Sequence, residues 1–139
     1  MPQEKDFHVM LGETIKYCQC IEHDIKMIYA GMRGGDIRAN MISIERETLG
    51  SAVTLLKEMD NQRSRPYFSY SDYGTLFGIT RIRNYWAHQG YVDYIYQPRE
   101  TVGRKFELQF QKLTADHDQM KKMHEITENV RLEFFKSKA

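Results

Sequence analysis

The sequence has few of the features that build sheets, disulfide frameworks or membrane spans. Its 139 residues include 3 prolines and 2 cysteines, and no run of Val, Ile and Thr alternates with polar residues. The frequent Leu, Met, Lys and Glu favour helix. No stretch reaches the roughly 18 apolar residues of a membrane span, and the charged start lacks a signal-peptide core. We therefore predict an all-α, soluble, cytoplasmic protein with a single domain, residues 1–139.

The charge and the cysteine content indicate which ligands and which redox environment the protein is suited to. The net charge is +1, so no global basic field indicates nucleic acid. Between Arg81 and Lys105, however, five basic residues stand against two acidic ones, a local charge of 5 − 2 = +3. That segment suits a small anionic ligand or one RNA strand. Cys18 and Cys20, two apart on a predicted helix, point to nearly opposite sides and are expected to stay unpaired, as in a reducing cytoplasm.

Apolar residues spaced three and four apart predict an up-and-down bundle of four main helices. A Gly34-Gly35 turn separates the first two helices, and Asp36 is expected to cap the second. His117 and His124 share a face of the last helix. Without a third ligand they are expected at core or edge positions, and no metal site is predicted. The predicted helices span residues 5–32, 36–59, 72–87 and 99 to nearly the end.

Two connecting segments contain many aromatic residues. The loop between Asp60 and Ser71 contains Arg65-Pro66, which breaks a helix. Its aromatic group suggests either base stacking or, as we prefer, anchoring of the loop on the bundle or on a second subunit. The segment from Tyr91 to Tyr96 is expected to form a helical turn or an irregular connection. The aromatic group in and just after the first segment comprises Tyr67, Phe68, Tyr70 and Tyr73.

The segment from Arg81 to His88 (Arg-Ile-Arg-Asn-Tyr-Trp-Ala-His) carries most of the functional information. It combines a cation with an imidazole, and the two suit phosphodiester chemistry. Arg83 can neutralise phosphate charge, and His88 can move a proton near pH 7. On a helix these two side chains are about 140° apart. They can meet if the helix loosens at Gly90, a natural stop, or if a second subunit supplies the arginine.

The spacing Arg83-Asn84-x-x-x-His88 resembles the Arg-polar-x-x-x-His motif of the HEPN superfamily, small helical bundles that often act as metal-independent ribonucleases. Thr48-Leu49-Gly50 resembles a run found late in the second helix of several HEPN proteins. Tyr91 follows the histidine by three residues, whereas many HEPN toxins have a tyrosine two residues after it. The resemblance covers the helical layout from about residue 5 to 135.

This resemblance implies an endoribonuclease that works as a homodimer with the two motifs facing each other, and needs no cofactor. His88 would act as general base or acid, Arg83 would stabilise the phosphate, and Asn84 would orient either group. Such a protein would be the toxin of a toxin–antitoxin or phage-defence pair, with RNA as substrate and an antitoxin as partner. The residues expected to contact RNA are Arg81, Tyr85 and Tyr91.

Two alternatives belong to other classes of protein. One is a non-catalytic HEPN-like module that binds a nucleotide, RNA or a protein partner in the same groove. The other is a structural bundle in which Arg83 pairs with a carboxylate and His88 caps a helix C-terminus, where a protonated imidazole is favoured.

Overall fold

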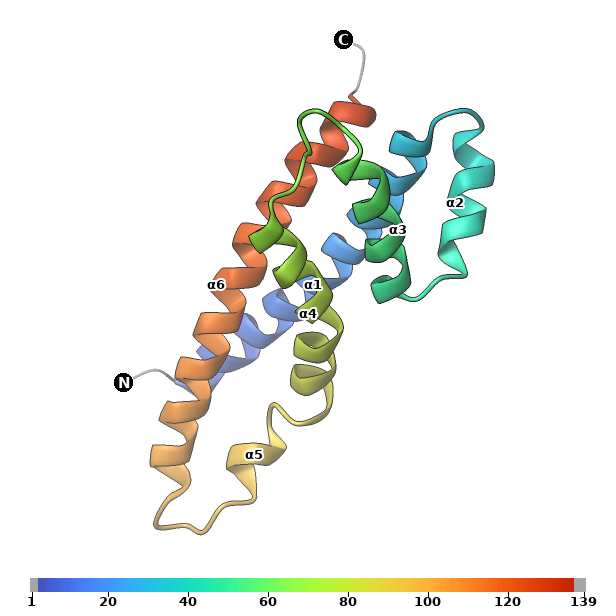
Figure 1. The fold of residues 1–139 in the computed structure, drawn as a ribbon. Coiled ribbons are helices and arrows are strands. Elements are labelled where there is room, and N and C mark those ends of the chain that lie inside the picture. Colours follow the sequence, from blue (N-terminus) through green and yellow to red (C-terminus); the bar gives the residue numbers. More distant parts are fainter. Residues whose placement is uncertain (1–2, 137–139) are drawn as a thin grey trace.

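The computed structural model describes residues 3–136, which form six helices and no strand (Figure 1). The all-α prediction is confirmed. Within the described part of the chain, no helix combines the length and apolar character needed to cross a membrane. The helices are α1 (Glu4–Arg33), α2 (Ile37–Glu45), α3 (Leu49–Asn61), α4 (Tyr70–His88), α5 (Val92–Ile95) and α6 (Val102–Phe134).

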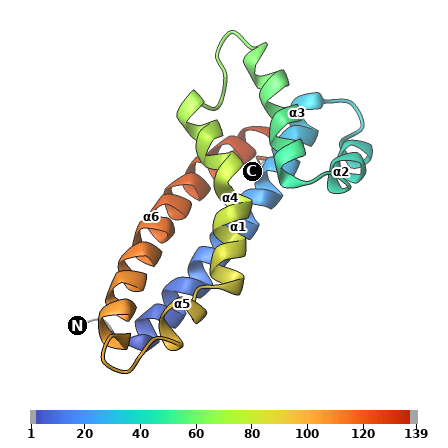
Figure 2. The ribbon, with the colours of Figure 1, turned by 60° about the horizontal axis from the view of Figure 1, so that its bottom comes forward.

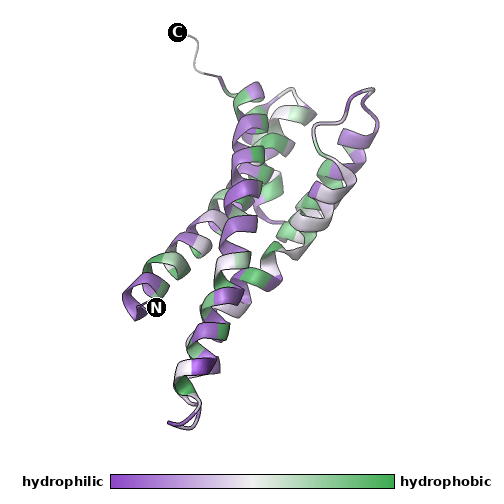
Figure 3. Cartoon of the chain, turned by 90° about the vertical axis from the view of Figure 1, so that its left-hand side faces the viewer, coloured by the Kyte–Doolittle hydropathy of each residue, from purple (hydrophilic) through white to green (hydrophobic). Residues whose placement is uncertain are grey.

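The two longest helices, α1 and α6, lie side by side and run in the same general direction (Figures 1 and 2). At one end, the Phe7 ring packs against Phe106 and Phe110, with centroids 5.7 and 6.1 Å away. At the other end, a Cβ added to Gly31 would lie 2.8 Å from Phe134 Cβ, so the glycine permits close approach. Figure 3 shows hydrophobic residues alternating with hydrophilic ones along the helices, as one buried stripe requires.

The turn after α1 is as predicted, but the second helix is not continuous. Gly34 and Gly35 adopt positive φ angles of 71° and 74°, a conformation that glycine reaches without steric cost. Asp36 caps α2 by accepting a hydrogen bond from the Ala39 N–H. The single helix expected over residues 36–59 is wrong. Helix α2 ends at Glu45, and α3 begins at Leu49 and folds back from α2 (Figure 1).

Side-chain capping explains this break, which contains no glycine or proline. Thr48 is extended and accepts a hydrogen bond from the Ser51 N–H at 3.1 Å, which makes it the N-cap of α3. The Ser51 hydroxyl donates in turn to Glu47. Threonine competes with the helix for backbone groups and is favoured at a helix start. Thr48-Leu49-Gly50 therefore begins a helix, contrary to its predicted place late in one.

The loop between α3 and α4 is anchored by Asp60, whose side chain is fully buried. Asp60 accepts hydrogen bonds from the backbone N–H groups of Tyr67 and Phe68, and from the hydroxyl of Tyr73. Phe68 and Tyr73 are buried, so the anchoring interpretation is confirmed for them. Tyr70, 89% exposed, is the exception.

The C-terminal part of the chain follows the prediction closely. The segment after α4 forms the four-residue helix α5, and α6 starts at Val102, close to the expected Arg99.

Both cysteines, which lie on α1, are free, as predicted. Cys18 is buried, and burial raises the pKa of its thiol to about 11, so it stays protonated and unreactive at neutral pH.

Candidate functional site

Helix α4 carries the residues of the Arg81–His88 segment, and its start is fixed by a capping box. Ser69 accepts a hydrogen bond from the Asp72 N–H, and the Asp72 carboxylate accepts one from the Ser69 N–H. Ser69 is therefore the N-cap, and α4 begins at Tyr70, two residues before the predicted start at residue 72. One face of α4 is buried in the core. The buried residues are Tyr73, Leu76, Ile79, Ile82 and Trp86.

The opposite face of α4 is an exposed line of six side-chain positions. They follow one another at alternating intervals of four and three residues, the spacing that keeps positions on one seam of a helix. The first half of the line is mainly aromatic and the second half is polar. Its members are Tyr70, Gly74, Phe77, Arg81, Asn84 and His88, and we call this set the α4 line.

His88 closes the α4 line and is still part of the helix. The Gln89 N–H donates to the Tyr85 carbonyl at 2.7 Å, so α4 does not loosen before Gly90. His88 lies on a different face of α4 from Arg83, so the two side chains of one chain do not meet in this structure, and their meeting stays a prediction. Within residues 3–136 the exposed imidazole of His88 has no hydrogen-bond or ion-pair partner. Its position in the last turn of α4 also agrees with the capping role in the structural alternative.

Arg83 leaves α4 on a different face from His88 and points toward α1. Its Nη1 donates to Glu22 Oε2 at 2.6 Å, and the two side chains are 30% and 25% exposed. Glu22 also lies 3.9 Å from the Lys26 ammonium. The Arg83–Glu22 ion pair is the carboxylate contact that the structural alternative expects. A guanidinium has five N–H donors, so this single bond leaves Arg83 further donors for a ligand.

An open pocket of about 450 Å³ lies beside Arg83. Three distant segments line it: Glu22 from α1, the start of α3, and one side of α4. The fold thus brings Thr48-Leu49-Gly50 and Arg83 to one cavity, although 35 positions separate Thr48 from Arg83. His88 does not line this pocket. The residues contributed by α3 and α4 are Thr48, Leu49, Gly50, Phe77, Thr80 and Arg83.

Tyr85, one of the predicted RNA-contacting residues, is held by the fold. Its hydroxyl donates to the Asp93 carboxylate and accepts a hydrogen bond from Gln109 Nε2 at 2.9 Å. The Lys112 ammonium lies 3.6 Å from the centre of its ring. Gln109 also donates to the Gly90 carbonyl. This half-buried network ties α4 to α5 and α6. The Tyr85 hydroxyl is engaged in it and does not reach the pocket beside Arg83.

Tyr91, the other predicted tyrosine, packs at the start of α1. Its hydroxyl lies 2.7 Å from His8 Nδ1, and its ring centroid lies 5.5 Å from that of Phe7. Burial raises the pKa of Tyr91, and the nearby Glu4 carboxylate adds to this. The phenol therefore stays protonated and able to donate near neutral pH. Neither tyrosine lines the pocket beside Arg83.

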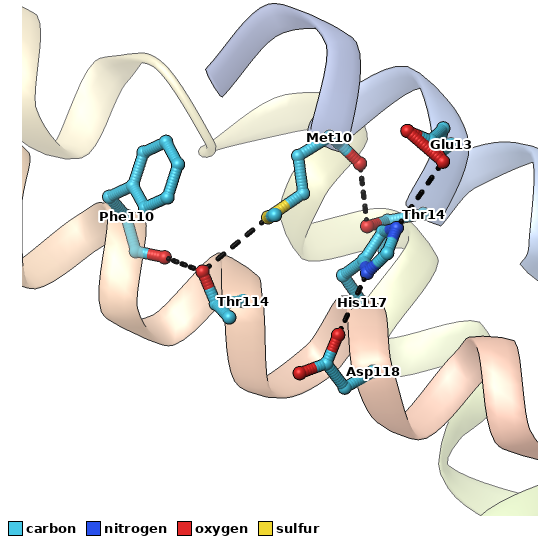
Figure 4. A network of polar contacts seen from close by, with 7 residues as sticks. All are labelled: Met10, Glu13, Thr14, Phe110, Thr114, His117 and Asp118. Atoms are coloured by element: carbon cyan, nitrogen blue, oxygen red, sulfur yellow. Dashed lines mark hydrogen bonds and ion pairs between the residues drawn. The ribbon is translucent and has the colours of Figure 1, made fainter. Parts of the chain in front are cut away.

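His117 and His124 occupy the positions expected for structural histidines. His117 is 9% exposed and lies between two carboxylates, with Nδ1 3.0 Å from Asp118 Oδ1 and Nε2 3.5 Å from Glu13 Oε2 (Figure 4). His124 is half-buried and faces Asp24 at 3.8 Å. In the described range, 3–136, no group of three His, Cys, Asp or Glu side chains is arranged to hold a metal ion. These contacts connect α6 with α1.

Comparisons with protein-family models, curated proteins and solved structures found no match for this chain. Functional inference therefore rests on the chain's own residues and their arrangement. Sequence reasoning identified Arg83, Asn84 and His88 but missed Glu22 and Phe77 as neighbours of Arg83. The only signal for Phe77 was an aromatic residue six positions before Arg83, and Glu22 was one of five carboxylates on an amphipathic helix.

Proposed function

We propose that the protein is a metal-independent endoribonuclease of the HEPN type, and that it is a cytoplasmic homodimer of four-helix bundles. The observation that carries the proposal is that α4 presents, on two of its faces, the Arg83 guanidinium at a pocket and the exposed His88 imidazole, which has no hydrogen-bond partner within residues 3–136. His88 ends the α4 line, and Arg83 borders an open pocket together with Thr48-Leu49-Gly50. The resemblance of the Arg83–His88 spacing to the HEPN motif supplies the reaction class.

The proposed reaction uses the RNA's own 2′-hydroxyl as nucleophile. His88 takes the proton from that hydroxyl, the 2′-oxygen forms a bond to phosphorus, and the bond to the 5′-oxygen breaks. The leaving oxygen receives a proton, from His88 or from a second imidazole, and the products carry a 2′,3′-cyclic phosphate and a 5′-hydroxyl. Arg83 stabilises the additional negative charge on the phosphate oxygens. The nucleophile is internal, so this route needs no metal-bound water.

A second copy of the chain is proposed to complete the site. Arg83 and His88 point to different faces of one α4, so one chain alone keeps them apart. The α4 line presents Tyr70, which is 89% exposed, beside Arg81 and Asn84. An isologous contact between two such lines would place polar groups of both copies in one groove. In that groove Asn84 orients the phosphate or an imidazole, and Arg81 and Tyr91 contact the RNA strand.

One observation favours a different function, a non-catalytic module that binds a nucleotide, RNA or protein partner in the same groove. Arg83 is already bound to Glu22 at 2.6 Å, and a guanidinium neutralised in this way attracts a phosphate less strongly than a free one. In a toxin–antitoxin or phage-defence pair, either activity would be controlled by an antitoxin protein.

The dimer is tested by adding a side chain at Gly74, the second position of the α4 line. A Cβ there meets no atom within 4 Å, so Gly74→Glu is tolerated by the single chain and obstructs only a contact between chains. We expect light scattering to give twice the chain mass for the wild type and the single-chain mass for Gly74→Glu. Gly12 on α1 is equally open, so Gly12→Glu is the matched control and should remain dimeric. A wild type with the mass of one chain would contradict the composite site.

The absence of a metal requirement is tested with chelator. Since the proposed groups are Arg83 and His88, RNA cleavage by the purified wild type is expected to continue unchanged in excess EDTA. The assay compares initial cleavage rates of a labelled single-stranded RNA with and without chelator. Loss of activity in EDTA, with recovery on addition of one divalent ion, would show that the mechanism is wrong.

A further inference from the structure

The pocket beside Arg83 offers more than a phosphate contact. At about 450 Å³ it lies within the range of roughly 300–1,000 Å³ of small-molecule sites. Arg83 stands at its edge, held by Glu22 through one N–H. A phosphate bound to the remaining donors of Arg83 would bring the attached nucleoside to the pocket. The pocket can therefore receive the base of a nucleotide whose phosphate is bound by Arg83.

Phe77 supplies the apolar contact that an unpaired base needs. Its side chain lines the pocket and is 45% exposed. Unstacked RNA bases bind proteins by stacking on aromatic rings, and each such contact contributes about 1–3 kcal/mol. The exposed ring of Phe77 is thus suited to stack on a base.

Glu22 supplies selectivity between bases. Its carboxylate is an acceptor held directly beside the N–H donors of Arg83. The Watson–Crick edge of guanine presents two adjacent N–H donors, which complement the two oxygens of one carboxylate. Adenine presents one donor next to an acceptor, so it leaves one contact unmatched. Buried or half-buried polar groups that lose a partner reduce affinity.

We propose that the pocket formed by Glu22, Phe77, Thr80 and Arg83 binds an unpaired guanine base, and so sets the base preference of the protein. The inference rests on the proposed function, because RNA is the molecule that carries such a base to Arg83. It goes further by assigning recognition to Glu22 and stacking to Phe77.

The test is calorimetric titration of the intact protein with 3′-GMP, 3′-AMP and inorganic phosphate. We expect 3′-GMP to bind at least about tenfold more tightly than either competitor, a difference of about 1.4 kcal/mol. Phe77→Ala should weaken 3′-GMP binding by about 5- to 150-fold, the size of one stacking contact. Glu22→Gln should bring the affinities for 3′-GMP and 3′-AMP close together. Tyr96→Ala, which removes another exposed aromatic outside the pocket, is the control and should bind as the wild type does.

The outcomes separate this inference from the ribonuclease proposal. Equal binding of 3′-GMP and 3′-AMP by the wild type, or no loss in Phe77→Ala, would overturn the guanine pocket even if RNA is cleaved. Selective 3′-GMP binding by a protein that cleaves no RNA would support the pocket and refute the nuclease. Circular dichroism of each variant confirms that the fold is retained, which is expected because both changed side chains are partly exposed.

Discussion

Replacing His88 by alanine is expected to lower the rate of RNA cleavage by about 10²–10⁴-fold, the usual size of a general acid–base contribution. The imidazole is exposed and, within residues 3–136, makes no hydrogen bond or ion pair. Its removal should therefore leave the helical signal and the melting temperature nearly unchanged. The measurement is a cleavage assay beside circular dichroism melting on the same preparations.

A second exposed histidine provides the control for this change. His23 lies on α1 outside the proposed site, so His23→Ala should cleave RNA at the wild-type rate. The structural alternative makes the opposite forecast for His88→Ala, a lower melting temperature with no activity to lose. Equal cleavage by His88→Ala and the wild type would remove His88 from the mechanism.

Replacing Arg83 by alanine is expected to reduce cleavage by about 10²–10³-fold, the effect of removing one preorganised donor from a developing negative charge. Arg83→Lys should recover little, because a point charge cannot reproduce the planar two-pronged grip of a guanidinium on phosphate. The Arg83–Glu22 ion pair is one contact at the edge of an open pocket, and fully exposed pairs contribute only about 0–1 kcal/mol to stability, so the loss of this less exposed pair should cost little more. Both variants should therefore fold.

The Arg83 series also distinguishes catalysis from structure. Arg38 is an exposed arginine on α2, and Arg38→Ala should leave both activity and stability unchanged. If Arg83→Ala unfolds at a much lower temperature while Arg83→Lys melts like the wild type, the ion pair with Glu22 is the main role of this residue. That pattern would favour the structural account.

The helical layout was predictable where local signals were strong. Gly34-Gly35 and Asp36 gave the turn and cap after α1, and the apolar stripe of α6 gave its length. The break between α2 and α3 was missed because it depends on Thr48, a residue that is compatible with either a helix interior or an N-cap. Side-chain hydrogen bonds to the backbone decide between these two states, and periodicity does not report them.

The candidate site was predictable only in part, because its neighbours come from distant segments. Helix geometry correctly separated Arg83 from His88, and α4 remains helical through both. Glu22, however, lies 61 positions before Arg83. The sequence contains 19 acidic residues, and only the packing of α1 against α4 selects this one. The pocket likewise depends on the fold-back of α3, which brings Thr48 beside Arg83.

The most direct test of the proposed reaction is the chemistry of the RNA ends produced by the purified wild type in excess EDTA. The substrate is a short single-stranded RNA containing guanine, compared with the same RNA carrying a single 2′-deoxy substitution at the mapped cleavage position. Cleavage by the internal 2′-hydroxyl predicts a 2′,3′-cyclic phosphate and a 5′-hydroxyl from the first RNA, and no cut at that position in the second. Products with a 5′-phosphate, or undiminished cleavage of the deoxy-substituted RNA, would contradict the roles assigned to His88 and Arg83.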